Sequence, residues 1–301
     1  MAIKQVRAQV NGTWHTLTYN SSTGKYEATI TAPGATSFNL SGGYYNVTVA
    51  ATNTAGTVGM ADGAALSGLR LVVKEKVAPT ISILSPSSGA YVTNSKQPVV
   101  FTVVDENGGS GINLGSLTVK LDSTVVASNT ITTTAITNGY SVTYTPPSAL
   151  ADGGHTVAVS VSDNDGNAAV TQSTSFTVDT VPPSLNLTAP TEGLVTASSG
   201  LNVSGKTNDA TSSPVTVNIK LNGVDQGNAT VGSDGSFSKT ITLATGTNTI
   251  VVTATDAAGK TTSVTRTVTL DTSVPKVLSA TITPNPVGAG ATMVISVEIS
   301  G

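Results

Sequence analysis

Four acidic residues are the best candidates for chemistry in this sequence. Asp105 and Glu106 stand in VVDENGGSG, and Asp163 and Asp165 stand in VSDNDGN. Carboxylates and Asn carbonyls supply the oxygen ligands that Ca²⁺ prefers. No cofactor is expected to be required, and calcium is the one candidate. The alternative is structural, because Asp and Asn before Gly are ordinary turn residues that bond their own backbone.

Groups for catalysis are scarce. The chain has 2 histidines, His15 and His155, and no cysteine. Neither histidine stands in a motif with a serine and an acid, and the sequence contains no GxSxG elbow, phosphate loop or dinucleotide fingerprint. His155 begins a strand where Asn248 begins one in a later repeat, and we expect it to be a surface histidine without a task. We therefore expect that the protein is not an enzyme.

The single tryptophan suggests a second kind of site. Trp14 follows the hairpin signal Asn11-Gly12, and an exposed aromatic face can stack on a sugar. Trp14 is therefore a candidate contact for a host-surface glycan. The alternative is that Trp14 packs inside its own domain.

Composition excludes several partners. The formal net charge is -3, and Lys and Arg do not cluster, so the electrostatic footprint of a nucleic-acid binder is missing. No apolar run is long enough to cross a membrane, and no signal peptide is visible at the start. We expect an extracellular or virion-associated protein. It would leave the cell by a route other than secretion, such as lysis, or its signal peptide would have been removed. The abundance of Thr, Ser, Val and Gly favours an all-β protein with many short strands.

Three stretches of the chain repeat in the same order. The late strand and turn read YYNVTVAATNTAGTV (44–58), HTVAVSVSDNDGNAAV (155–170) and NTIVVTATDAAGKTTS (248–263). An earlier strand aligns Val10, Leu121 and Leu221, and an aromatic after a turn glycine aligns Gly24/Tyr26, Gly139/Tyr140 and Gly235/Phe237. Three copies of the same landmarks in the same order predict an array of similar modules.

Proline-bearing connectors join the modules, for example KEKVAPTISILSP (74–86) and VDTVPPSLNLTAP (178–190). Because proline fixes φ, these joints should be short and stiff. Seven or so strands in roughly 95 residues, without helical periodicity, indicate a β-sandwich of immunoglobulin type. The connectors, the central LNG strand and the VTATDAAGK turn resemble the bacterial immunoglobulin-like (Big) repeats of surface proteins and of prophage tail or fibre proteins. Tandem sandwiches in an extended array are therefore the predicted fold.

The predicted boundaries leave a partial domain at each end. Residues 1–76 form an incomplete immunoglobulin-like domain without its first two strands, residues 77–180 and 181–273 form intact ones, and residues 274–301 form a two-strand segment. The first two strands of the intact domains lie in the 26 residues after Pro79 and Pro182, and the segment from Pro275 has the same length. The two ends therefore look like complementary parts of one domain.

The alternating pattern of the tail indicates a strand that buries one face. We predict that the tail of one subunit enters the incomplete domain of the next and so builds a head-to-tail filament. The predicted donor residues are Leu278, Ala280, Ile282, Met293, Ile295, Val297 and Ile299, and the predicted acceptor residues are Val6, Ala8 and Val10.

Three alternatives stay open. The chain could be a fragment of a longer repeat array, or its tail could dock on a different virion or cell-surface protein that anchors a single copy. The protein could instead be an adhesin-like or carbohydrate-binding module, because one fold serves many roles.

Overall fold

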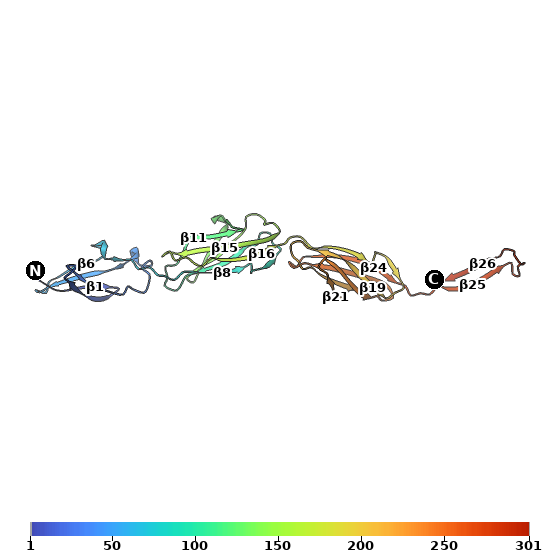
Figure 1. The fold of residues 1–301 in the computed structure, drawn as a ribbon, viewed down its shortest axis with the longest axis horizontal. Coiled ribbons are helices and arrows are strands. Elements are labelled where there is room, and N and C mark those ends of the chain that lie inside the picture. The colour runs from blue at the N-terminus through green and yellow to red at the C-terminus, as the bar shows by residue number, and fades with distance from the viewer. Residues whose placement is uncertain (1, 301) are drawn as a thin grey trace. The chain divides into compact units, whose positions relative to one another are not determined.

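The computed structural model describes residues 2–300 and consists almost entirely of strands (Figure 1). The helical elements in this part of the chain are three 3₁₀ turns: η1 (Ser41–Gly43), η2 (Ser67–Leu69) and η3 (Ser128–Thr130). The predicted all-β class is confirmed. Among the described residues, no helix has the length and hydropathy needed to cross a bilayer. The chain divides into two compact units, Met1–Val178 and Asp179–Gly301.

The second unit contains the most regular sandwich. Its strands run in the order β17-β19-β22-β21-β20-β23-β24-β18. Alternate side chains of β20 and β23 point into a shared core, where Val217, Ile219 and Val252 are fully buried. The strand bounds are β17 (Ser184–Ala189), β18 (Leu194–Thr196), β19 (Gly200–Asn208), β20 (Thr216–Leu221), β21 (Val224–Val231), β22 (Ser236–Thr242), β23 (Gly246–Thr255) and β24 (Thr261–Leu270).

The later part of the first unit is another sandwich. Its two sheets have the orders β13-β14-β10-β8 and β12-β11-β15-β16-β9, and Phe101 and Phe176 lie at 0% and 2% exposure in the core between them. The strand bounds are β8 (Thr80–Ser85), β9 (Ala90–Val92), β10 (Val99–Val104), β11 (Ile112–Leu121), β12 (Thr124–Val125), β13 (Ile131–Ile136), β14 (Gly139–Tyr144), β15 (Gly153–Asp163) and β16 (Gln172–Val178).

The earlier part of the first unit has one main sheet, in the order β3-β2-β1-β5-β6, and a small β4-β7 pair. Its buried hydrophobic residues, among those described, are only Val6, Ala8 and Ala50. A sheet without a facing sheet cannot bury both layers of a sandwich core. The strand bounds are β1 (Ile3–Val10), β2 (Thr13–Asn20), β3 (Lys25–Glu27), β4 (Tyr45–Asn46), β5 (Thr48–Asn53), β6 (Val58–Ala61) and β7 (Arg70–Leu71).

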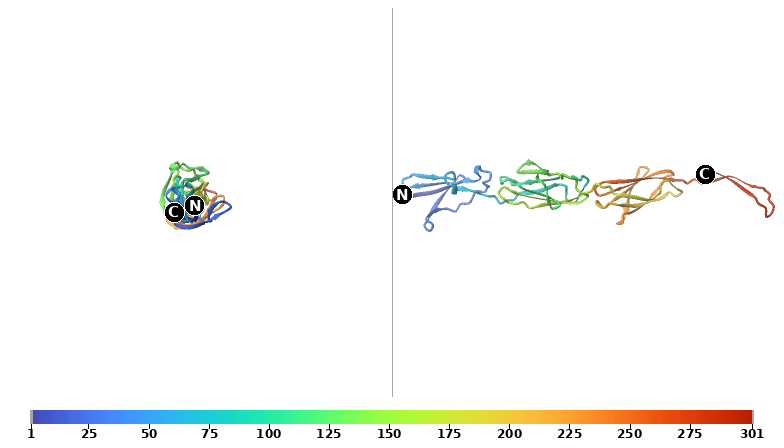
Figure 2. Two further views of the ribbon diagram at one scale, coloured as in Figure 1. Left: turned by 90° about the vertical axis from the view of Figure 1, so that its left-hand side faces the viewer. Right: turned by 90° about the horizontal axis from the view of Figure 1, so that it is seen from above.

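The last two strands form a hairpin of their own, which Figure 2 shows as a bare two-stranded ribbon in red. The strands are β25 (Lys276–Thr283) and β26 (Val294–Ser300). They pair with each other in antiparallel fashion, as β8 pairs with β10 and β17 with β19. Every residue from 271 to 300 is exposed. The hairpin therefore has the strand pairing of a domain start without the core that such a start normally covers.

The structure corrects one expectation about His155. The side chain is not a surface histidine, because His155 is 9% exposed and both ring nitrogens are engaged. Nδ1 lies 2.7 Å from Asp122 Oδ2, and Nε2 lies 2.9 Å from Ala151 O. Asn248 occupies the matching place and is fully buried. The alignment with Asn248 was correct, and the expected exposure was wrong because the strand start is covered by the preceding loop.

Candidate functional site

The β25–β26 hairpin carries an apolar face made from both strands. The register places Val277 opposite Ile299, Ala280 opposite Val297, and Ile282 opposite Ile295. Cross-strand partners in an antiparallel pair lie on the same face. The large side chains of this face are 44–61% exposed: Val277, Ile282, Met293, Ile295, Val297 and Ile299. Leu278 falls at a register shift between Val277 and Ser279, so Val277 is the residue opposite Ile299.

Residues 1–76, 77–180 and 181–273 are called the first, second and third domains. A groove in the first domain is lined by residues whose counterparts in the third domain are core residues. The cavity has a volume of about 350 Å³, and Val10, Ile30 and Val47 are among its lining residues. Their counterparts in the third domain are Leu221, Ile241 and Ile250, which are 7%, 3% and 0% exposed. The three groove residues are only half-buried. The groove therefore occupies a core position that no strand of the described residues covers.

The match between Ile30 and Ile241 follows from adjacent segments. Residues 25–31 read KYEATIT, and residues 236–242 read SFSKTIT. In β22 this segment pairs along its whole length with β19. In the first domain β3 ends at Glu27, and Ile30 lies outside any strand. β3 pairs with β2 on one side only, whereas β22 pairs with both β19 and β21. An edge strand lacks the second ladder of hydrogen bonds, which explains why β3 is short.

The turn glycines of the repeat show where the missing neighbour belongs. A Cβ added at Gly139 would lie 2.0 Å from Val103 O, and one added at Gly235 would lie 2.1 Å from Thr207 O. These carbonyls belong to β10 and β19, the second strands of the intact domains. A Cβ added at the matching Gly24 would meet nothing within 4 Å. Gly24 has a φ of +68°, which by itself favours glycine, and the described residues place no strand close to it.

Of the predicted acceptor residues, Val10 lines the groove, whereas Val6 and Ala8 are already buried at 8% and 6% exposure. All three lie on β1, whose neighbour β5 aligns with β23 of the third domain. Val6 pairs with Ala51 as Val217 pairs with Ala254. The groove residue Ile30 was not predicted; the KYEATIT/SFSKTIT match is the signal that could have found it.

The predicted acidic residues separate into two groups. Asp105 and Glu106 offer carboxylate oxygens that lie within 4.8 Å of each other and of Glu75. Asp163 Oδ1 instead accepts hydrogen bonds from the amides of Gly166 and Asn167. These contacts close the turn, as a structural role for Asp163 requires.

Asp165 lies beside the connector that precedes the second domain. Its Oδ2 accepts hydrogen bonds from Thr36 Oγ1 at 2.5 Å and from the amide of Glu75 at 3.0 Å. Lys74 Nζ donates to the backbone carbonyl of Asp165 at 3.0 Å. Asp165 therefore holds residues 74–75 against the late hairpin turn of the second domain.

The Asp105 carboxyl is electrostatically strained. Burial raises its pKa, and the hydrogen bond that Oδ2 accepts from the amide of Gly111 lowers it. The negative charges of Glu75, Asp163 and Asp165 then raise the pKa further, so the net shift is upward. Asp105 is 4% exposed, and its Oδ1 has no hydrogen-bond partner. A cation placed among these carboxylates would relieve the strain.

Sequence reasoning missed two acidic residues. Glu75 stands in the connector before the second domain, and Asp179 stands in the connector before the third. Glu75 precedes Asp105 by 30 residues, and Asp179 precedes Asp209 by the same 30. This repeated spacing is the signal that could have found them.

Trp14 is 37% exposed, and the guanidinium of Arg7 lies over its ring at 5.0 Å from the centroid. The side chain therefore lies on the outer part of the first domain and makes a cation–π contact. That contact covers part of the ring face that a sugar would need.

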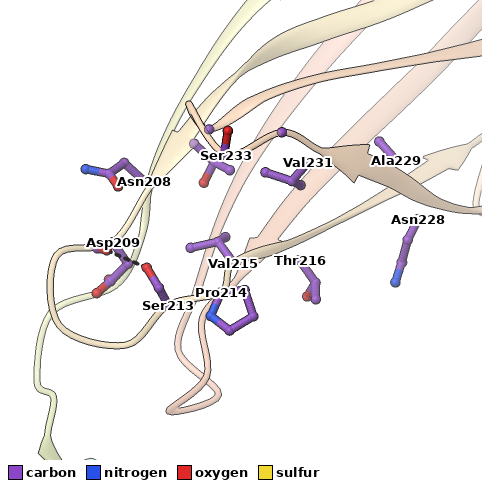
Figure 3. Close-up of a pocket in the computed structure, with 13 residues that line it drawn as sticks. Asn208, Asp209, Ser213, Pro214, Val215, Thr216, Asn228, Ala229, Val231 and Ser233 are labelled. Carbon is purple, nitrogen blue, oxygen red and sulfur yellow. Dashed lines mark hydrogen bonds between the residues drawn. The ribbon is translucent and has the colours of Figure 1, made fainter.

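A cavity of about 440 Å³ opens in the third domain between the end of β19 and the β20–β21 hairpin (Figure 3). Asp209 is the one titratable residue that lines it. Ser213 Oγ donates to the carbonyl of Asp209 at 2.9 Å. Asp209 Oδ1 accepts hydrogen bonds from the amides of Thr211 and Ser212, so this carboxylate is held by its own loop.

The strand orders and cores define the described chain as a tandem of immunoglobulin-like β-sandwiches. Residues 85–180 match the family model of the bacterial Ig-like domain, and residues 183–272 match that of glucodextranase domain B. The predicted resemblance to bacterial immunoglobulin-like repeats is thereby confirmed. None of the curated proteins compared matches the chain.

Solved structures with related architecture include fibronectin(III)-like modules of Clostridium thermocellum CbhA, at 16% identity and a TM-score of 0.41 over 64% of this chain and 94% of that one. Sidekick-1 immunoglobulin domains 1–5 match at 13% identity and a TM-score of 0.39, over 99% and 60% of the two chains. Domains A168–A170 of titin match at 14% identity and a TM-score of 0.39, over 87% of this chain and 85% of that one. The assignment depends on the strand orders and family models rather than on these scores.

Proposed function

We propose that this protein is a structural subunit that assembles head-to-tail. The β25–β26 hairpin of one copy covers the groove of residues 1–76 in the next copy. This is β-strand donation, in which main-chain pairing supplies affinity and side-chain pockets supply register. Each copy then has one donor and one acceptor, and such a heterologous contact continues into a filament unless it closes into a ring.

The strand order is the observation that carries the proposal. The third domain has the order β17-β19-β22-β21-β20-β23-β24-β18, and the first has only the counterparts of the five strands from β22 to β24, in the order β3-β2-β1-β5-β6. Placing β26 beside β3, with β25 outside it, restores the positions of β19 and β17. The glycine at Gly24 leaves room for that strand, as Gly235 does beside β19.

Burial supplies the driving force. The six large side chains of the hairpin face are about half exposed, and burying their exposed parts contributes roughly 5–9 kcal/mol before the cost of association. The groove residues Val10, Ile30 and Val47 lose their remaining exposure in the same step. Since the hairpin is already paired, little backbone ordering opposes it.

Two matched variants test the proposal. A donor-defective chain, Ile295→Asp, places a charge on the apolar face of the hairpin, and an acceptor-defective chain, Ile30→Asp, places one in the groove. We expect the unaltered chain to form long filaments in negative-stain electron micrographs and each variant alone to sediment as one chain of 30.0 kDa.

Mixing the variants distinguishes the possible partners. One chain still has a good donor and the other a good acceptor, so we expect a complex of two chains and no growth beyond it. A hairpin that closes on its own chain would give monomers at every concentration. Filaments that persist in either variant would rule out the proposed contact.

The placement of the filament on a virion or a bacterial surface, and an anchor protein at its base, stay predictions. The immunoglobulin-like tandem supports a surface or structural role. Electron microscopy of the source particles with antibody to the second domain would test it.

A further inference from the structure

We propose that the two intact domains carry equivalent calcium sites where their connectors meet their loops. Asp179, Asp209 and Asp256 form one site, and Glu75, Asp105 and Glu106 form the other. The two sites are independent of strand donation, because neither includes residues of the groove or of the β25–β26 hairpin.

The first site is built from three separate segments of the third domain. Asp179 precedes β17, Asp209 follows β19, and Asp256 follows β23. Each offers an oxygen within 4.8 Å of the others. Oxygens bound to one Ca²⁺ at 2.3–2.6 Å lie at most about 5 Å apart, so one ion can reach all three.

These carboxylates are buried without a counter-charge. Asp179, Asp209 and Asp256 are 0%, 9% and 6% exposed. The ion pairs His155–Asp122 and Lys206–Asp234 lie outside the site. Three buried like charges in one place are unfavourable unless a cation compensates them.

One oxygen is left for a ligand. Asp256 Oδ1 accepts a hydrogen bond from the amide of Lys260 at 2.8 Å, whereas Oδ2 is buried and has no partner. A buried, unpaired carboxylate oxygen is costly and is rare in native proteins. Asp256 offers an oxygen within 4.8 Å of oxygens of Asp179 and Asp209, so a cation bound among the three would supply the partner that Oδ2 lacks.

The other carboxylates of this site are held by hydrogen bonds. Asp209 Oδ1 accepts from the amides of Thr211 and Ser212, and Asp179 Oδ2 accepts from the Ser212 hydroxyl. These donors fix the two carboxylates in place. The site is therefore preorganised by its own loop.

The second site shows the same signs. Glu75 Oε2, Asp105 Oδ1 and Glu106 Oε2 are all buried and lack a hydrogen-bond partner. A Cβ added at Gly109 would lie 2.6 Å from Asp105 Oδ2 and 2.9 Å from Glu75 Oε2. The absence of a side chain at Gly109 keeps the space between the carboxylates open. A cavity of about 470 Å³, lined in part by Asp105 and Glu106, gives access from solvent.

The ligand set selects a hard divalent cation. All six side chains offer oxygen, and the chain has no cysteine; zinc and copper sites normally use nitrogen or sulfur. Carboxylates that converge from loops suit the flexible, high coordination of Ca²⁺ better than the compact octahedron of Mg²⁺. Calcium would tie each connector residue, Glu75 or Asp179, to the loops of its own domain.

Two near-isosteric variants of the full chain test the proposal. Asp256→Asn keeps the acceptor for the Lys260 amide, and Asp105→Asn keeps the acceptor for the Gly111 amide, so both variants should fold. By calorimetric titration with CaCl₂ in excess MgCl₂, we expect two ions per unaltered chain, one per single variant and none for the double variant. Asp225→Asn, at an exposed hairpin of the third domain, is the control and should still bind two.

Thermal unfolding gives a second measurement. At calcium 100-fold above its Kd, we expect the Tm of each intact domain to rise by roughly 10–20 °C relative to EDTA, and the variants to lose the rise in the domain that carries the substitution. Unaltered binding in Asp256→Asn and Asp105→Asn, or no binding by the unaltered chain, would overturn the proposal. Circular dichroism in EDTA checks that the variants fold.

Discussion

Replacing Ile295 with alanine should weaken assembly strongly, whereas the same replacement at Val294 should not. The two residues are neighbours on β26 and are 58% and 63% exposed in the free chain. Their faces differ: Ile295 lies opposite Ile282, and Val294 lies opposite Thr283. Only the Ile295 face is continuous with the apolar residues that would enter the groove.

The size of each effect on binding depends on whether the side chain becomes buried in the filled groove. In a filled groove Ile295 becomes a core residue, like the fully buried Val203 of β19. Truncating a buried Ile to Ala costs about 2–5 kcal/mol, which corresponds to roughly 30- to 5,000-fold in the dissociation constant. At Val294 a solvent-facing truncation changes the free energy by about 0.5 kcal/mol or less, or roughly twofold.

The assay isolates a single interface. The chain with Ile30→Asp has an intact hairpin and cannot accept, so it binds a chain with Ile295→Asp only once. Adding Ile295→Ala or Val294→Ala to the Ile30→Asp chain and measuring the Kd by sedimentation velocity gives each cost directly. Equal effects of the two alanine substitutions would refute the assignment of the inward face. No effect of either would refute donation itself.

Three further perturbations probe the intact second domain. Phe101→Ala should lower its free energy of unfolding in urea by about 3–5 kcal/mol, since Phe101 is 0% exposed. Gly139→Ala should lower it by about 1–3 kcal/mol, because the new Cβ would lie 2.0 Å from Val103 O; a neutral result in urea would contradict that contact. Burial lowers the pKa of His155, but hydrogen bonds with Ala151 O and Asp122 outweigh it, so the net shift is upward from 6.5. The contribution of this histidine to the free energy of unfolding is thus complete below pH 6.5 and is lost as pH rises through the folded-state pKa. His155→Asn should flatten this dependence of the free energy of unfolding on pH. An unchanged dependence would contradict His155 as its cause.

Part of the candidate sites could be predicted from residue patterns. Alternation along residues 293–299 identified an apolar strand face, because successive side chains of a strand point to opposite sides. The repeated strands placed Val10 with Leu221, and the register of β1 with β5 matches that of β20 with β23 under this alignment. The bulge that brings Val277 opposite Ile299 could not be predicted, because register depends on both strands of the pair.

Less of the acidic sites than of the hairpin face could be predicted from the sequence. Asp105 and Glu106 were found because they stand together after a strand, but their partner Glu75 is 30 residues away along the chain. Asp163 was grouped with them, although its carboxylate is used by the amides of its own turn. Which oxygens remain unpaired depends on hydrogen bonds between loops, and no linear pattern encodes those.

The sequence by itself indicated the class of this protein: turn residues, β-branched residues and a repeat of the same landmarks are typical of a series of small β-sandwiches. It also predicted that residues 1–76 hold fewer strands than the repeats that follow them. The tertiary structure alone decided that Val10, Ile30 and Val47 line one groove and that three carboxylates from distant segments share one site. Both depend on contacts between residues far apart in the chain, where packing rather than local preference sets the neighbours.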